Sequence, residues 1–197
     1  MQALSARYDA ALQLAAIAHR HQVRKATHIP YITHPVHVSI ILLRHGFHEE
    51  LAIAGLLHDV VEDCDMTIAE LQAEFGEVVA RLVEAVSEQK QAAGVERSWE
   101  ARKAEKLAHM RNGDADVAAL KAADALHNAW SIRHDLAELG PVVWQRFKRG
   151  AAPSVGYYRE IAAIAREKLG AHTLVVELEA MVASLAQAAQ LPPESPE

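Results

Sequence analysis

The sequence has little of several features that would define a class of protein at once. Cys64 is the only cysteine among 197 residues, so neither an internal disulfide nor a cysteine-rich zinc site can form. This usage fits a reducing compartment, and we expect a cytoplasmic protein. No apolar run approaches the length of a membrane span. The first twenty residues carry polar side chains throughout, unlike a signal peptide, so we expect no membrane association.

The chain also lacks an excess of positive charge. Its formal net charge is -6, which excludes the broad basic face that a long nucleic acid requires. A small anionic ligand remains compatible with this balance, because a local basic cluster would suffice. With 51% apolar and 23% charged residues, the chain can bury a substantial core.

Strand-like alternation is absent, and apolar residues recur with a helical period almost throughout. We therefore predict an all-α fold, a single compact bundle of roughly eight to ten helices around a central metal site. This domain is expected to span residues 1–190, and the tail 191–197, LPPESPE, is expected to be disordered. The longer predicted helices cover residues 4–21, 35–46, 49–61, 99–110, 115–139, 154–168 and 173–189. Shorter ones begin after Thr67 and after Gly76.

Three separated segments supply candidate metal ligands: His34, the pair His58-Asp59, and Asp124. His58 and Asp124 fall on the apolar stripes of their predicted helices, where an ionisable side chain is costly unless it is paired or bound to a metal. One divalent cation would satisfy all four groups. Two nitrogens and two carboxylates without a thiolate suit Mn²⁺ best, with Fe²⁺ and Zn²⁺ left open by ligand type.

An acidic pair, Glu62 and Asp63, follows His58-Asp59 by one helical turn. A metal with open positions can turn bound water into a nucleophile. One carboxylate of the pair could accept a proton from that water, and the other could orient it. The sequence therefore predicts a catalytic role for both residues.

Positive charge lies near the same segments, which favours an anionic substrate. Arg24 and Lys25 come shortly before His34, and Arg102 and Lys103 belong to a basic helix over 99–110. Asn128 is four residues after Asp124 and could therefore reach a ligand beside the metal. These five residues are the candidates for substrate binding: Arg24, Lys25, Arg102, Lys103 and Asn128.

Three blocks, PYITHP, LLHDVVED and KAADALHN, occur in an order and spacing that resembles the HD-domain hydrolase half of RelA/SpoT homologues. The resemblance covers about residues 8–136. Long members of that family add synthetase and regulatory domains, for which 197 residues leave no room. The chain is thus similar in plan to stand-alone small alarmone hydrolases such as the metazoan SpoT homologue, and SWEARKAEKL also resembles that branch.

The resemblance implies a Mn²⁺-dependent enzyme of the stringent response that removes the 3′-pyrophosphate from guanosine tetra- or pentaphosphate, (p)ppGpp. In this sequence the implied metal ligands are His34, His58, Asp59 and Asp124. The implied water-activating pair is Glu62 and Asp63. The resemblance further implies that Arg24 and Lys25 flank the nucleotide base and that Asn128 lies on the ribose side.

The chain departs from the family pattern beside the implied base pocket. Ala129-Trp130-Ser131 stands where Met-Arg-Thr is usual, Ala125 replaces an arginine, and the connector from Lys25 to Pro30 differs in composition. Adenosine 3′-pyrophosphates, (p)ppApp, therefore remain open, as do other phosphorylated nucleotides such as NADPH. A phosphohydrolase of another specificity within the HD superfamily is the alternative. A catalytically inactive alarmone sensor is disfavoured because every ligand and both acidic residues are present.

Overall fold

A computed structural model of the chain describes residues 5–88, 91–92 and 95–191. Within these ranges the fold is all-α as predicted, with nine α-helices and one 3₁₀ helix, apart from one antiparallel pair of two-residue strands. The elements in chain order are α1 (Ala6–Ala18), α2 (Thr33–Arg44), α3 (Glu49–Leu57), α4 (Val60–Asp63), α5 (Ile68–Val86), β1 (Gln91–Ala92), β2 (Val95–Glu96), α6 (Trp99–Asn112), α7 (Ala115–Leu139), η1 (Gly140–Arg146), α8 (Ala151–Leu169) and α9 (Thr173–Ala188).

Polar side chains at the helix N-termini explain where several helices begin. The hydroxyl of Thr67 accepts the Glu70 N–H while the Glu70 carboxylate accepts the Thr67 N–H, which forms a capping box at the start of α5. Ser98 and Asp114 cap α6 and α7 in the same manner, each accepting an N–H three residues later. The long helix α7 ends where Gly140 adopts a φ of 68° ahead of Pro141.

The helix expected over 49–61 is interrupted at the two residues that carry most of the predicted chemistry. The structure ends α3 at Leu57 and starts α4 at Val60, with His58 and Asp59 in the turn between them. The His58 ring donates from Nδ1 to the carbonyl of Gly55 at 2.8 Å. The break lets adjacent residues face one point, which a continuous helix would hold about 100° apart.

Other differences from the sequence-based expectations are small. The two helices predicted on either side of Gly76 form one element, α5, kinked where Gly76 has a φ of 79°. The antiparallel strands β1 and β2 lie between α5 and α6, where no strand was expected. The 3₁₀ helix η1 continues the chain beyond the predicted stop at Gly140. Of the predicted tail, residues 192–197 lie outside the described ranges.

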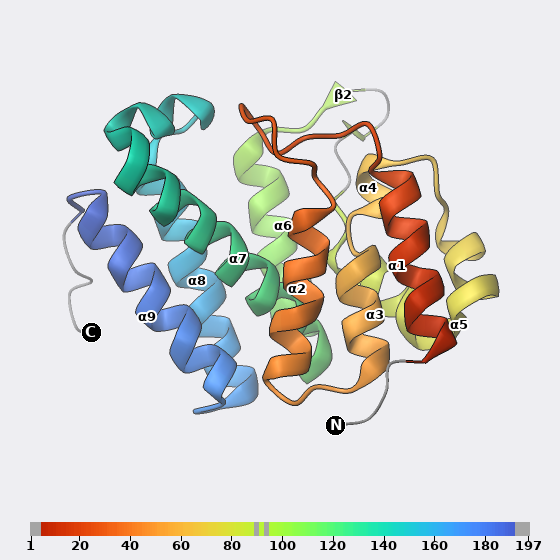
Figure 1. Cartoon of the computed structure of the whole chain (residues 1–197). Coiled ribbons are helices and arrows are strands. Elements are labelled where there is room, and N and C mark those ends of the chain that lie inside the picture. Colours follow the sequence, from red (N-terminus) through yellow and green to blue (C-terminus); the bar gives the residue numbers. More distant parts are fainter. Residues whose placement is uncertain (1–4, 89–90, 93–94, 192–197) are drawn as a thin grey trace.

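The helix α7 is the centre of the bundle. It packs against α2 on one side and α8 and α9 on the other, while α3 packs between α1, α2 and α5 (Figure 1). Every residue of α3 from Leu51 to Leu57 is buried. Helices from distant parts of the sequence, α2, α3 and α7, thus meet in the interior, and the predicted ligands lie on or beside these three.

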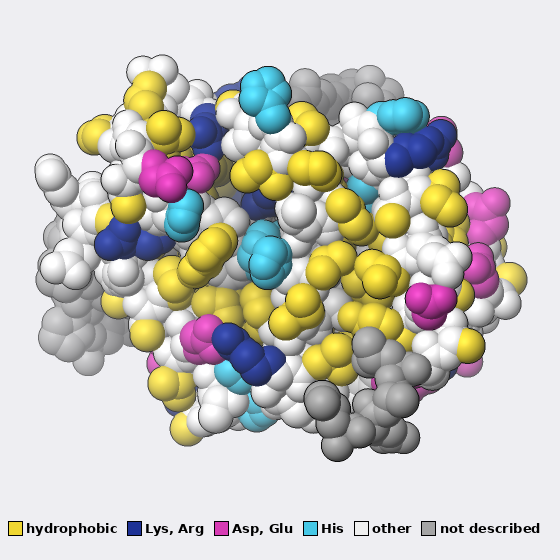
Figure 2. All heavy atoms as spheres, in the orientation of Figure 1, with side chains coloured by type: hydrophobic (Ala, Val, Ile, Leu, Met, Phe, Trp, Pro, Cys, Tyr) yellow, Lys and Arg dark blue, Asp and Glu magenta, His cyan; other side chains and the backbone are white. Residues whose placement is uncertain are grey.

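Figure 2 shows that the face seen in Figure 1 carries hydrophobic and histidine side chains with only scattered Lys and Arg. Among the residues that the structure describes, no helix combines the length and apolar character needed to cross a bilayer.

Candidate metal centre and adjoining cavities

His34, His58 and Asp59 form a compact buried cluster. One potential ligand atom from each lies within 4.8 Å of the others. Asp59 Oδ2 is 3.1 Å from His58 Nε2 and 3.7 Å from His34 Nε2. Asp124, from the middle of α7, places Oδ1 3.3 Å from His34 Nε2. The structure therefore brings all four predicted ligands together, with Asp124 beside the three-residue cluster.

The hydrogen bonds of the two histidines leave lone pairs pointing at the carboxylates. Because His58 Nδ1 donates to Gly55, the neutral ring would carry its lone pair on Nε2, a buried atom 3.1 Å from Asp59 Oδ2. His34 Nδ1 lies 2.7 Å from His127 Nδ1, so a proton donated by His34 leaves its Nε2 free to bind an ion. Lone pairs facing carboxylate oxygens need a cation between them. The donor set therefore fits a divalent metal ion.

The electrostatics of the cluster agree with this fit. Burial alone would raise the pKa of Asp59 and Asp124, but neighbouring cations and hydrogen-bond donors hold both well below the usual range. Burial would lower the pKa of His58, yet the carboxylates outweigh it and raise the value to about 9. A proton on His58 thus takes the place that a metal ion would hold, and metal binding should release it.

A second layer of side chains contacts the predicted ligands. The Tyr31 hydroxyl donates to Asp59 Oδ2 at 2.6 Å, Lys121 Nζ lies 2.6 Å from Asp124 Oδ2, and Asn128 Nδ2 donates to Asp124 Oδ1 at 2.6 Å. Burial, followed by the charges of His34, Arg24 and His37, lowers the pKa of His127 to about 2, so this ring stays neutral and can accept from His34. The sequence-based reasoning gave no role to three of these residues, Tyr31, Lys121 and His127. Their position inside or beside the ligand blocks was the available signal.

A cavity of about 260 Å³ opens beside the ligands, and we call it the metal-side cavity. Its lining combines His34, Asp59 and Asp124 with three lysines and several rings. The other residues that line it are Arg24, Tyr31, Trp99, Lys103, Lys106, Lys121, Ala125, Asn128, Phe147, Ser154, Tyr157, Tyr158 and Ile161. The Tyr157 hydroxyl is buried there and has no hydrogen-bond partner among the described residues, and Lys103 Nζ lies 5.2 Å from the centre of the Tyr157 ring. An unpaired donor among ammonium groups suits an anionic ligand.

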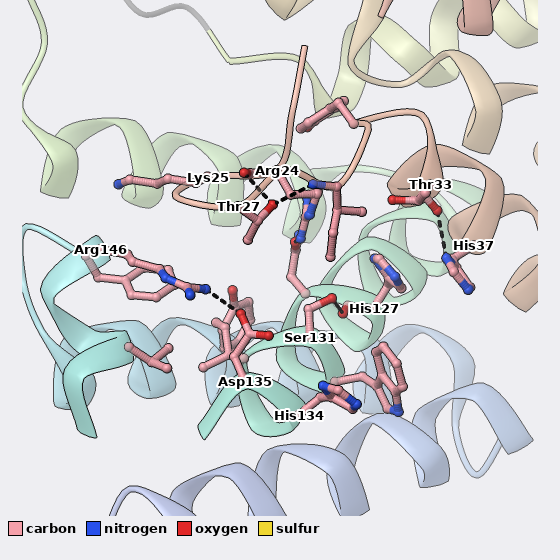
Figure 3. A pocket seen from close by; sticks show the side chains of 18 residues that line it. Arg24, Lys25, Thr27, Thr33, His37, His127, Ser131, His134, Asp135 and Arg146 are labelled. Carbon is pink, nitrogen blue, oxygen red and sulfur yellow. Dashed lines mark hydrogen bonds and ion pairs between the residues drawn. The ribbon is translucent and has the colours of Figure 1, made fainter. Parts of the chain in front are cut away.

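A second cavity of about 410 Å³ adjoins the first, and we call it the ring-lined cavity (Figure 3). The two share Arg24 and Asn128, which form part of both linings and are joined by a 2.7 Å hydrogen bond from Arg24 Nη2 to Asn128 Oδ1. The His37 and His127 rings stack at 4.6 Å between centroids, and Trp130 continues the stack 6.1 Å from His127. These planar groups provide a surface suited to an aromatic base.

Figure 3 shows further residues of the ring-lined cavity. Lys25 belongs to the lining, with Nζ 5.7 Å from the centre of the Phe147 ring. Arg146 forms an ion pair with Asp135 across the far end of the cavity. Of the predicted substrate-binding residues, Arg24, Lys25 and Asn128 therefore line this cavity together.

The acidic pair, Glu62 and Asp63, forms the end of the short helix α4. Glu62 Oε2 is 3.1 Å from Lys106 Nζ and accepts the Glu88 N–H at 3.1 Å. The backbone carbonyl of Asp63 accepts from Gln22 Nε2 at 2.8 Å, and the Asp63 charge is among those that raise the pKa of Tyr31. Neither carboxylate belongs to the lining of the metal-side cavity as the structure stands.

The two predicted basic residues of α6 differ in placement. Lys103 lines the metal-side cavity, whereas Arg102 does not. Both pair with Glu88, Lys103 Nζ at 2.9 Å from Oε2 and Arg102 with the other oxygen. No role of its own was predicted for Lys106, which lines the cavity beside Lys103, or for Glu88.

Comparison with known proteins places the chain in a family. The HD domain family matches residues 11–150, a range that contains every ligand candidate, so the chain belongs to that family of helical metal-dependent hydrolases. It is 34% identical over 167 residues to the bifunctional (p)ppGpp synthase/hydrolase SpoT of Escherichia coli K12, which covers 84% of this chain and 22% of SpoT. It is 39% identical over 128 residues to a guanosine-3′,5′-bis(diphosphate) 3′-pyrophosphohydrolase of Aquifex aeolicus, covering 64% of this chain and 18% of the relative.

The similarity extends to solved structures. A metazoan orthologue of SpoT that hydrolyses ppGpp superimposes with a TM-score of 0.77 at 27% identity, covering 98% of this chain and all of that one. A Listeria monocytogenes protein gives a TM-score of 0.67 at 38% identity over 76% of this chain and 96% of its own. The chain spans about a fifth of the length of the curated relatives it matches. The expected resemblance to HD-domain hydrolases of the RelA/SpoT type is thereby confirmed.

Proposed function

We propose that this chain is a Mn²⁺-dependent nucleotide 3′-pyrophosphohydrolase that degrades the alarmones (p)ppGpp or (p)ppApp to the 5′-nucleotide and pyrophosphate. One observation carries the proposal: a histidine–aspartate cluster and a stack of rings line two cavities that share Arg24 and Asn128. A nucleotide with a 3′-pyrophosphate would place its phosphates in the first cavity and its base in the second.

The names of the relatives alone do not select hydrolysis, since a GTP pyrophosphokinase of Streptomyces coelicolor is 33% identical over 171 residues. The site favours it. Its buried nitrogen and oxygen donors suit a metal that activates water, and the residues that supply them all fall within the HD domain match. The relatives named as 3′-pyrophosphohydrolases and the metazoan orthologue supply the substrate class.

We assign His34, His58, Asp59 and Asp124 as the residues that hold the ion. When bound there, a divalent ion such as Mn²⁺ would lower the pKa of a coordinated water and polarise the phosphoryl group. His127 accepts from His34, and Tyr31 and Lys121 hold the two carboxylates, so the ligand atoms keep their directions.

The acidic pair would handle the proton of the attacking water. We assign Glu62 as the general base and Asp63 as the group that orients the water. A new bond forms between the water oxygen and the phosphorus next to the ribose, and the bond to the ribose 3′ oxygen breaks. Pyrophosphate leaves as one unit, and the ribose oxygen takes up a proton to become a hydroxyl. Glu62 Oε2 lies 3.1 Å from Nζ of Lys106, which lines the metal-side cavity.

The substrate would be held by different groups at its two ends. Arg24, Lys25 and Asn128 are assigned to the nucleoside. Lys103, which lines the metal-side cavity, is assigned to the phosphates, and Arg102 is assigned to the same end of the substrate beside it. The free thiol of Cys64 agrees with a reducing cytoplasm as the working compartment.

The test is hydrolysis of a substrate panel by the purified protein loaded with Mn²⁺, with a chelator-treated sample as the control. The panel should contain guanosine and adenosine 3′-pyrophosphates, NADPH, plain 5′-nucleotides and a phosphomonoester, with products identified by ³¹P NMR. We expect pyrophosphate from a 3′-pyrophosphorylated nucleotide and no turnover after chelation. Release of orthophosphate from the other compounds alone would contradict the proposed reaction and favour an HD enzyme of another specificity.

A further inference from the structure

Glu88, the second residue beyond α5, gathers the positive charge of α6 into one buried network. Its side chain is only 2% exposed, and its carboxylate pairs with three cations of that helix. Lys103 Nζ is 2.9 Å and Lys106 Nζ 3.2 Å from Oε2, while Arg102 pairs with Oε1. The three cations lie at positions i, i+1 and i+4, on one side of α6.

Glu88 is also connected to Glu62, the proposed general base, once directly and once through Lys106. The Glu88 backbone N–H donates to Glu62 Oε2 at 3.1 Å. Lys106 Nζ lies 3.1 Å from that Glu62 oxygen and 3.2 Å from Glu88 Oε2, so one ammonium group joins the two carboxylates. The position of the Glu62 carboxylate is therefore defined by a backbone group of Glu88 and by a lysine that Glu88 holds.

Stability alone does not explain this network. Removing a carboxylate and several cations from water costs several kcal/mol per ion, and apolar residues of similar volume are often as stable or more so. The cations do hold the carboxylate in its ionised form: burial would raise the pKa of Glu88, but Lys106, Lys103 and Arg102 lower it to about 2. A buried ion-pair network of this kind restricts the positions of the side chains that take part in it.

We propose that Glu88 is a positioning residue that orients Glu62 for catalysis, through its own N–H and through Lys106. The inference rests on the proposed role of Glu62 as the general base. Within the part of the chain that the structure describes, the contacts of Glu88 are with Glu62 and with the cations of α6. Its effect passes entirely through Glu62 and the lysines at the cavity wall.

The experiment is a double-mutant cycle on kcat with the Mn²⁺-loaded protein and whichever substrate of the panel is cleaved. Glu88→Gln keeps the shape and the backbone N–H but removes the charge that holds Lys106. We expect kcat to fall about ten- to a hundredfold in the wild-type background, the scale of a misplaced catalytic group. In a Glu62→Gln background the same change should lower kcat less than about twofold, because the group that it positions is already lost.

An equal loss in both backgrounds would overturn the inference, since a general structural defect would affect each alike. Glu100→Gln is the matched control: Glu100 lies on α6 in an exposed pair with Arg149, and its loss should leave kcat unchanged. If Glu88→Gln does not fold, Lys106→Met enters the same cycle with the same expected signature. A cleaved substrate that is not a 3′-pyrophosphate contradicts the proposed function but leaves the cycle interpretable.

A second readout does not depend on turnover. Glu62→Ala removes the acceptor of the Glu88 N–H, so hydrogen exchange of that amide should accelerate about tenfold or more, while Glu100→Gln leaves it unchanged. An amide that exchanges at the same rate in Glu62→Ala and wild type would show that the Glu88–Glu62 contact is not maintained in solution. That result would overturn the inference.

Discussion

The metal-side cavity and the ring-lined cavity share Arg24 and Asn128, but they are built in opposite ways. In the first, buried charges face one another and depend on a cation for balance, as at His58 and Asp59. In the second, the polar groups are satisfied by the protein itself: the Thr27 hydroxyl donates to the Arg24 carbonyl and the Ser131 hydroxyl to the His127 carbonyl. The metal-side cavity is therefore suited to chemistry at a metal ion. The ring-lined cavity offers shape and stacking, which discriminate between bases less strictly than hydrogen bonds to the base would.

The strongest test of this contrast is removal of a ligand from the metal-side cavity. Asp59→Ala should abolish metal retention and lower activity by about a thousandfold or more, because the remaining histidine lone pairs lose the anion that balances the ion. Metal content after gel filtration and initial rates measure the two effects. Asp135→Asn, which changes an aspartate of the ring-lined cavity, is the control and should retain the ion. Loss of the ion from the Asp135→Asn variant would contradict the distinction between the cavities.

A smaller effect is expected when the chemistry is disabled and the ion is kept. Glu62→Gln should bind Mn²⁺ as the wild type does, since Glu62 is held by Lys106 and Glu88 and is proposed to act on water. Its kcat should fall by about a hundredfold or more, the usual cost of losing a general base. Metal titration combined with steady-state kinetics separates these quantities. A variant that lost its metal would show that Glu62 is a ligand.

His127 tests whether the two cavities are independent, because it lines the ring-lined cavity and also contacts His34 of the metal-side cavity. Its ring stacks in the ring-lined cavity, and its Nδ1 accepts from the proposed ligand His34. His127→Phe keeps a ring but removes the acceptor, so Mn²⁺ affinity should fall about ten- to a hundredfold. Isothermal titration against His134→Phe, a neighbour on the same helix, provides the comparison. Equal affinities in the two variants would contradict the orienting role.

The smallest effect is expected in the ring-lined cavity. Trp130 is 47% exposed and stacks on the histidine rings, so Trp130→Ala should raise KM about tenfold and leave kcat nearly unchanged. Leu139→Ala, an exposed apolar residue on the same helix, serves as the control. Kinetics on guanosine and adenosine 3′-pyrophosphates would also show whether this ring influences the choice of base. A loss confined to kcat would contradict a binding role.

The comparison also explains what the sequence could predict. The proposed ligands lie in short blocks, with His58 beside Asp59, and the inward-facing positions of His58 and Asp124 followed from the helical period. The turn between α3 and α4 could not be foreseen, because the hydrogen bond from His58 to Gly55 overrides a helical pattern that runs through both residues. The ring-lined cavity joins His37 of α2 with Trp130 of α7, ninety-three positions apart, and only tertiary packing brings such residues together.

The contact at Gly55 has a consequence for how the protein folds. A Cβ there would lie 3.0 Å from Leu42 Cδ1 and 3.3 Å from the Ser39 backbone, so glycine allows α2 and α3 to approach closely. These helices are neighbours in the sequence, and their docking brings His34 to His58 and Asp59 with little loop-closure entropy. Asp124 arrives only when α7 docks. We therefore expect α2 and α3 to dock before α7, and Mn²⁺ to bind this helix pair weakly and so accelerate refolding. Gly55→Ala should diminish that acceleration in stopped-flow measurements.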